Sequence, residues 1–160
     1  MARPQRYRRH QRVREAASQR YAPGSPPPAV AGILLDSDVI IDALRGRREI
    51  SDGIRAVEGR GVPTYCCAIS FAEIWAGVRS GEEAIADAFF HARGEVVLDA
   101  AVGRRAGAYL SRYSRSHGLQ IADALVAAAA STAGLRLWTL NRRHYPMSEL
   151  AFHDDQAPPT

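Results

Sequence analysis

The stretch GILLDSDVIIDAL, residues 32–44, decides the fold. Its first half is a short apolar run typical of a buried strand, and two carboxylates, Asp36 and Asp38, follow at once. The overlapping segment VIIDALRG, residues 39–46, has the apolar spacing of a helix that ends near Gly46. A strand therefore runs directly into a helix, and the rest of the chain continues this alternation.

Three further apolar runs predict strands in PTYCCAI (63–69), EVVLD (95–99) and LRLWTL (135–140). Helical patterns separate them, at about 50–58, from Ser70 to about Val78, at 81–92, from about Ala100 to His117, and at 121–134. Strands separated by helices form mostly parallel sheets that are covered on both faces. The sequence therefore predicts an α/β fold with a central sheet of four or five strands.

The composition predicts one soluble domain. The chain has 160 residues, of which 46% are hydrophobic, enough for a single core. No apolar run reaches the roughly 18 residues of a membrane span, and the basic N-terminus lacks the apolar core of a secretory signal, so we expect a cytoplasmic protein. Cys66 and Cys67 are adjacent in a predicted strand and point to opposite faces, so we expect no disulfide between them.

Charge divides the chain into segments. Residues 1–29 carry seven arginines and one glutamate, whereas the whole chain has a net charge of only +4, so the remainder is net negative. Residues 1–30 also contain PGSPPP and few aliphatic side chains, and we expect them to be disordered, as an RNA-attracting arm or a solvated extension. We expect residues 31–155 to form the domain and 156–160 a flexible tail.

Acidic side chains fall where a parallel sheet binds ligands, beyond the carboxyl ends of its strands. Asp36 and Asp38 follow the first strand, and Glu73 lies in the first turn of the helix after the second. Asn141 follows the fourth strand, and Asp123 opens the helix before it. These residues are the candidates for one shared site.

Carboxylates that converge repel one another, and a hard divalent cation removes that conflict. Mg²⁺ or Mn²⁺ prefers oxygen ligands and activates water at phosphate, whereas the sequence has no HExxH or paired CxxC motif that would indicate zinc. Structural alternatives remain: a turn or cap role for Asp36 and Asp38, a capping box of Ser70 with Glu73, stabilisation of Asp123 by the helix dipole, and a turn role for Asn141.

Four segments together resemble the PIN-domain family, in particular the toxin ribonucleases of VapBC toxin–antitoxin pairs. They are LLDSDVIIDAL (34–44), ISFAEIWAGV (69–78), IADALVAAAA (121–130) and LWTLNRRHYP (137–146). The resemblance runs from about Ile33 to Phe152. It implies a PIN-like α/β/α sandwich, homodimerisation, Mg²⁺ or Mn²⁺ as cofactor, endonucleolytic cleavage of RNA, and inhibition by a cognate antitoxin.

The resemblance also implies roles for single residues. Asp36, Glu73 and Asp123 would be metal ligands and catalytic residues, and Asn141 a fourth catalytic residue at a position where many members have aspartate. An amide contributes no negative charge, so we expect one metal ion in the resting site rather than two. Asp38 is a candidate to compensate for the missing charge.

Residues around the motifs are open to two interpretations. Five arginines could hold RNA phosphates or simply be solvated: Arg45, Arg47, Arg48, Arg142 and Arg143. His144 has apolar neighbours and is interpreted as a packing residue rather than a general acid. Trp75 and Trp138 are expected in the core.

Two other functions compete with the ribonuclease. LLDSDVII resembles the D-x-D opening of haloacid-dehalogenase-like phosphatases, with Asp36 as nucleophile, but that chemistry generally needs a lysine and the chain has none. The second alternative is a module that binds RNA or a partner without cleaving, which the neutral Asn141 favours.

Overall fold

The computed structural model describes residues 32–154 and shows strand β1 (Ile33–Leu35) running directly into helix α2 (Ser37–Leu44). Asp36 is the single residue between them and the N-cap of α2. All three residues of β1 are buried, which is why this strand is apolar without alternation. The strand-to-helix step predicted from residues 32–44 is confirmed.

The sheet has four strands, all parallel, in the order β3-β2-β1-β4. The other three are β2 (Thr64–Cys67), β3 (Gly94–Val96) and β4 (Arg136–Trp138). Beyond β4, Phe152 forms an isolated parallel bridge with Leu137. The order places β1 between β2 and β4, so residues that follow these three strands lie at one edge of the sheet.

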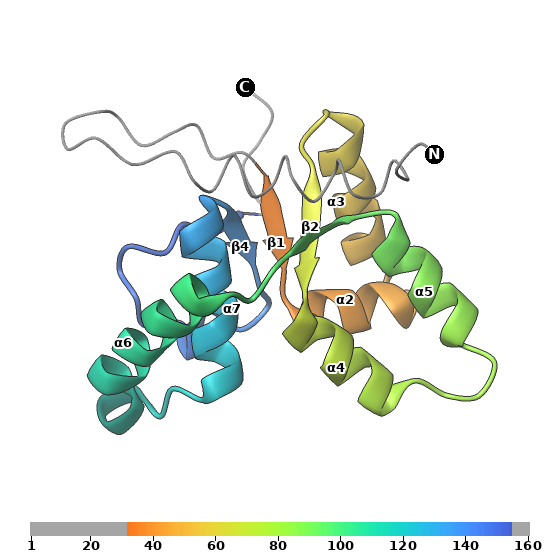
Figure 1. Cartoon of the computed structure of the whole chain (residues 1–160). Helices are drawn as coiled ribbons and strands as arrows, with labels where there is room; N and C mark the ends of the chain where they lie inside the picture. The colour runs from red at the N-terminus through yellow and green to blue at the C-terminus, as the bar shows by residue number, and fades with distance from the viewer. Residues whose placement is uncertain (1–31, 155–160) are drawn as a thin grey trace, which may run out of the picture.

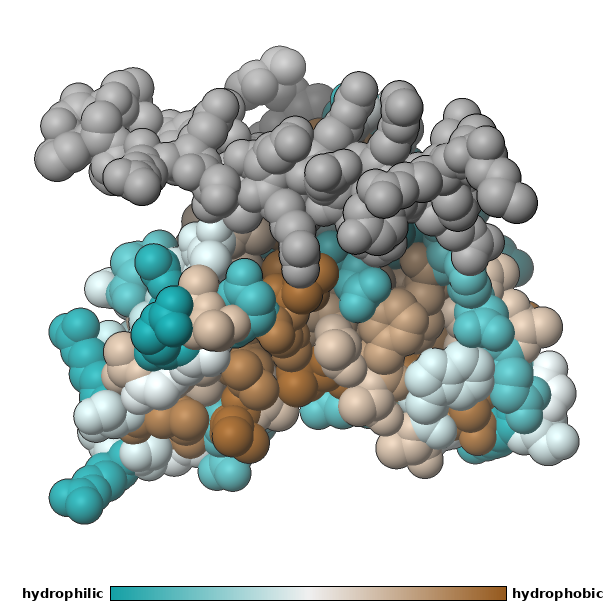
Figure 2. Space-filling model, viewed as in Figure 1, coloured by the Kyte–Doolittle hydropathy of each residue, from teal (hydrophilic) through white to brown (hydrophobic). Residues whose placement is uncertain are grey.

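Helices cover both faces of the sheet (Figure 1). One layer consists of α2, α3 (Arg48–Gly59), α4 (Ala68–Gly77) and α5 (Glu83–His91), and the other of α6 (Ala100–His117) and α7 (Ile121–Ala133). Each layer has its own buried cluster, one containing Leu35 and Ile54, the other Leu34 and Val126. The face in Figure 2 shows hydrophobic residues down the middle and hydrophilic ones toward α5 and α6. The α/β/α sandwich is confirmed.

Capping side chains and glycines mark the ends of α6 and α7. The Asp99 carboxylate caps α6 by accepting hydrogen bonds from the backbone N–H groups of Ala101 and Val102. Helices α6 and α7 both end at a glycine with positive φ, Gly118 at 66° and Gly134 at 64°. These boundaries agree with the prediction to within one residue.

Helix α4 starts earlier than predicted, at Ala68 instead of Ser70. Ser70 therefore lies inside the first turn, fully buried, with its hydroxyl 4.0 Å from the Cys67 sulfur. The proposed capping box with Glu73 is wrong because Ser70 does not occupy the N-cap position. Glu73 is left exposed on the helix and available to the site.

The Tyr65 ring lies against the backbone at Gly94 of β3 and at Gly32, the residue before β1. A Cβ atom added to Gly94 would lie 2.5 Å from this ring, and one added to Gly32 would lie 2.7 Å from it. Both distances are shorter than real Cβ contacts, so glycine at each position makes room for the aromatic side chain.

Several expectations concern other parts of the chain or its setting. Cys66 and Cys67 are both free and buried, as predicted, and burial raises the pKa of the Cys66 thiol to about 12.

The predicted disorder of residues 1–30 and the flexible tail at 156–160 lie outside the described residues. Within residues 32–154, no helix is long and apolar enough to cross a membrane.

Candidate active site

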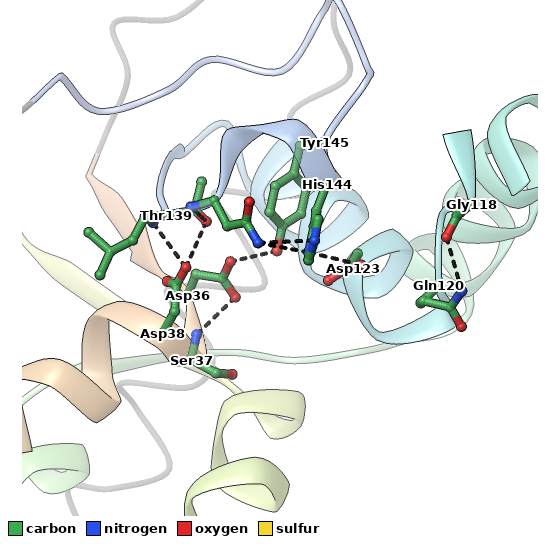
Figure 3. A network of polar contacts seen from close by, with 11 residues as sticks. Asp36, Ser37, Asp38, Gly118, Gln120, Asp123, Thr139, His144 and Tyr145 are labelled. Atoms are coloured by element: carbon green, nitrogen blue, oxygen red, sulfur yellow. Dashed lines mark hydrogen bonds and ion pairs between the residues drawn. The ribbon is translucent and has the colours of Figure 1, made fainter. Parts of the chain in front are cut away.

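The Asp36 carboxylate is held from two sides at the carboxyl end of β1 (Figure 3). Its Oδ1 accepts a hydrogen bond from the backbone N–H of Ser37 at 2.8 Å. Its Oδ2 accepts one from the hydroxyl of Tyr145 at 2.7 Å. Asp36 is only 8% exposed, so this capping residue also presents a buried, oriented negative charge. The cap interpretation of Asp36 is therefore confirmed, and its role as a metal ligand stays a prediction.

Asp123 lies in the first turn of α7, from the opposite helical layer, with 25% of its side chain exposed. Burial raises the pKa of its carboxyl group, and the charges of Asp36 and Glu73 raise it further, whereas His144 opposes the shift. Three acidic residues from distant parts of the sequence thus interact electrostatically. Asp36 and Glu73 lie near enough to Asp123 for their charges to raise its pKa, and these three residues make up the candidate acidic site.

Asn141 and His144 form a side-chain pair on the fourth side of this site. Asn141 follows β4, and its amide nitrogen lies 3.0 Å from the His144 Nε2. The His144 Nδ1 lies 3.8 Å from the Asp123 Oδ2. The His144 side chain is 49% exposed, so its interpretation as a packing residue is wrong. Through His144, Asn141 is linked to the acidic site.

Asp38 is fixed by hydrogen bonds to the loop that carries Asn141. Its Oδ2 accepts from the Leu140 backbone N–H at 3.0 Å and from the Thr139 hydroxyl at 3.3 Å. Burial raises the pKa of Asp38 to about 6, and the Asp36 charge adds to the shift. The same Thr139 hydroxyl accepts a hydrogen bond from the Asn141 N–H at 3.0 Å. Asp38 thus joins the start of α2 to the loop after β4.

The donor set suits a hard cation, because it consists of carboxylate oxygens whose charges repel one another. As the side chains are oriented, however, no three His, Cys, Asp or Glu residues within 32–154 lie close enough to hold one metal ion. Glu73 is exposed. Ligation of one ion by all three carboxylates would require them to lie closer together than they do in this structure.

Two of the flanking arginines have partners. Arg47 forms an ion pair with Asp42 at 2.9 Å. Arg142 pairs with Asp154 and donates to the backbone oxygen of His153 at 2.9 Å. For Arg45, Arg48 and Arg143, which are all exposed, the described residues show no ion pair. These three are the better candidates for binding a phosphate.

The two tryptophans differ. Trp138, at the end of β4, is 2% exposed and belongs to the core as predicted. Trp75, on α4, is 37% exposed, so its assignment to the core is wrong.

A groove of about 330 Å³ begins beside Glu73 and runs between α2, α4 and α5. Ile41, Ile74 and Ile85 contribute its apolar lining, and Ile85 is 61% exposed. A second hollow of about 310 Å³ shares Leu44 and Ile85 with it. The two hollows adjoin each other, and charged side chains also line the first, among them Arg79 and Glu82.

Three residues of the site were absent from the predicted set or misread. Tyr145 and Thr139 were not selected, and His144 was assigned to packing. Each contacts a carboxylate more than 20 positions away in the sequence. No local spacing pattern reports such contacts. The one available signal was the position of all three in the segment LWTLNRRHYP.

Comparison with known proteins supports the resemblance to the PIN-domain family. Residues 33–151 match the PIN domain family. Ribonuclease VapC10 of Mycobacterium tuberculosis is 36% identical over 118 residues, which cover 73% of this chain and 88% of that protein. Ribonuclease VapC19 of the same species is 32% identical over 126 residues, covering 78% of this chain and 98% of that protein.

Solved structures show the same fold. A DNA-bound VapBC from Salmonella typhimurium superposes with a TM-score of 0.67 at 17% identity, covering 78% of this chain and 98% of that one. VapBC2 from Rickettsia felis, bound to a promoter DNA fragment, gives 0.66 at 17% identity, covering 76% and 96%. The haloacid-dehalogenase alternative is therefore wrong. By its fold, its motifs and these relatives, the chain belongs to the PIN domain family.

Proposed function

We propose that this protein is a metal-dependent endoribonuclease that acts as the toxin of a type II toxin–antitoxin pair. The observation that supports the proposal is that Asp36 and Glu73, from two other motifs, lie near enough to Asp123 for their charges to raise its pKa. The similarity to two proteins named as VapC ribonucleases supports RNA as the substrate. We expect the protein to act in the cytoplasm.

Asp36 and Asp123 would hold Mg²⁺ or Mn²⁺, and Glu73 would ligate it or orient the attacking water. When bound, the ion would neutralise charge on the phosphodiester and activate water. Asn141 would position water or phosphate through its side-chain amide. Because Asn141 is neutral, we propose a single metal ion in the resting site.

The substrate would approach over an exposed basic rim. Arg143 lies in the short helical turn that follows Asn141, and Arg45 lines the groove that begins beside Glu73. A guanidinium group binds phosphate oxygens through paired hydrogen bonds. We therefore propose these arginines as the RNA phosphate contacts, with Arg48 as a third.

The partner would be a cognate antitoxin. Several solved neighbours are toxin–antitoxin complexes, among them one from Klebsiella pneumoniae. The groove beside Glu73 has the apolar lining and exposed Ile85 that a bound peptide segment would cover. An antitoxin segment lying there would also block access to Glu73. We further propose that the toxin forms a homodimer, as in the family.

The test is cleavage of total RNA by the purified, antitoxin-free full chain with Mn²⁺. Cleavage should disappear with EDTA and fall by about 10²-fold or more in Asp36→Asn and Asp123→Asn. Asp87→Asn, which removes an exposed carboxylate on α5, is the matched control and should retain full activity. Intact RNA across several substrates and metals would refute catalysis and favour the non-cleaving binding module.

A further inference from the structure

Tyr145 places a phenolic hydroxyl directly on the best-buried carboxylate of the site. The residue is 4% exposed, and its hydroxyl lies 2.7 Å from the Asp36 Oδ2 (Figure 3). The backbone N–H of Ser37 binds the other oxygen at 2.8 Å. Each carboxylate oxygen has a second lone pair, so both stay able to bind a cation while their orientation is fixed.

The direction of this hydrogen bond follows from the chemistry of its two groups. The phenol has an O–H group to donate, whereas an ionised carboxylate can only accept, so Tyr145 donates and Asp36 accepts. A charged acceptor makes such a bond stronger than one between neutral groups.

The aromatic ring of Tyr145 packs against the segment that follows β4, at the edge of the sheet. It packs edge-to-face against Phe152, with ring centroids 6.4 Å apart. Phe152 in turn bridges to Leu137 of β4. The segment after β4 thus holds the hydroxyl in place through packing that does not depend on Asp36. Packing of the ring fixes the position of the hydroxyl, and the hydroxyl makes the contact with Asp36.

We infer that Tyr145 is a positioning residue that orients the Asp36 carboxylate for the metal ion. This inference rests on the proposed function, because it assumes that Asp36 is a metal ligand. Partners that orient a ligating carboxylate influence metal affinity, and their loss typically weakens it by about 10–100-fold. Removal of the hydroxyl alone should therefore weaken metal binding without removing the ring that packs in the core.

The structure offers a closely matched control. Tyr109 is also buried, at 6% exposed, in the same core cluster as Tyr145. Its hydroxyl has no hydrogen-bond partner among the residues that the structure describes. Tyr109→Phe makes the same chemical change at a hydroxyl that holds no carboxylate, so it should leave metal binding unaltered.

Calorimetric titration of the full chain with Mn²⁺ tests the inference without measuring activity. We expect Tyr145→Phe to raise the Kd for Mn²⁺ by about tenfold or more, and Tyr109→Phe to leave it unchanged. Thermal unfolding would show whether both variants remain folded. RNA cleavage should then recover in Tyr145→Phe as Mn²⁺ is raised toward saturation, a rescue that a purely structural defect would not show.

The outcomes separate this inference from the proposed function. If the wild type binds Mn²⁺ and Tyr145→Phe binds it equally well or more tightly, the positioning role is refuted and the ribonuclease proposal stands. Equal weakening in both Tyr→Phe variants would also refute it, because the effect would then be general. If the wild type binds no metal, the inference and the metal-dependent proposal both fail.

Discussion

Replacement of Asp38 by asparagine should change the pH dependence of stability. The folded protein raises the pKa of this carboxyl from 3.8 to about 6, because Asp38 is partly buried and faces Asp36. The folded state therefore holds the proton to a higher pH than the unfolded chain does. The Asp38 contribution to stability is greatest below pH 4 and is lost as the pH rises through about 6.

The size of the change in stability follows from the pKa shift of Asp38. A pKa unit corresponds to about 1.4 kcal/mol, so the full shift would cost about 3 kcal/mol at neutral pH. Asp38 is partly exposed, and solvent screening reduces the expected value to about 1–2 kcal/mol. An asparagine side chain cannot titrate, so Asp38→Asn should gain stability relative to the wild type by this amount between about pH 4.5 and about pH 7.5.

Urea unfolding in EDTA, followed by circular dichroism at several pH values, measures the difference. Asparagine keeps one acceptor oxygen where aspartate has two, so part of the hydrogen bonding from Val39, Leu140 and Thr139 is lost, and this penalty is treated as independent of pH. Asp87→Asn makes the same chemical change at an exposed carboxylate on α5 and serves as the control. The reasoning would be refuted if the stability difference between Asp38→Asn and the wild type varied with pH no more than that of the control, or if the variant lost relative stability as the pH rose.

Two further changes test the sheet and the site. Gly94→Ala should destabilise the fold by about 1–3 kcal/mol, because the new methyl group meets the Tyr65 ring, and should be nearly neutral when Tyr65→Leu is also present. Equal costs in both backgrounds, measured by urea unfolding, would exclude this clash. Asn141→Asp should tighten Mn²⁺ binding by roughly tenfold, because it adds a charged ligand to the site; calorimetry that finds unchanged or weaker binding would contradict this.

The sequence was sufficient for the sheet and for the acidic residues because both depend on local patterns. Buried parallel strands are short apolar runs, and Asp36 follows the first of them without an intervening residue. The rule that ligands bind beyond the carboxyl ends of strands then selected Glu73 and Asn141. Asp123 was harder to place, since it reaches the site from the other helical layer.

The remaining features depend on contacts that a single sequence does not reveal. The hydroxyl of Tyr145 binds a carboxylate 109 positions away, and the apolar neighbours of His144 gave no sign that its ring is half exposed. Trp75 was misassigned because α4 is apolar on most sides while only part of it is buried. Periodicity cannot indicate which side of such a helix is covered.

The bridge between Leu137 and Phe152 has a practical consequence for protein engineering. The backbone N–H of Leu137 donates to Ala151 at 2.8 Å, and that of His153 donates to Leu137 at 2.9 Å. The segment after β4 is therefore hydrogen-bonded to the sheet as far as His153. A shortened version should keep every residue through His153, and an affinity tag or fusion partner belongs beyond it, where it leaves the support of Tyr145 intact.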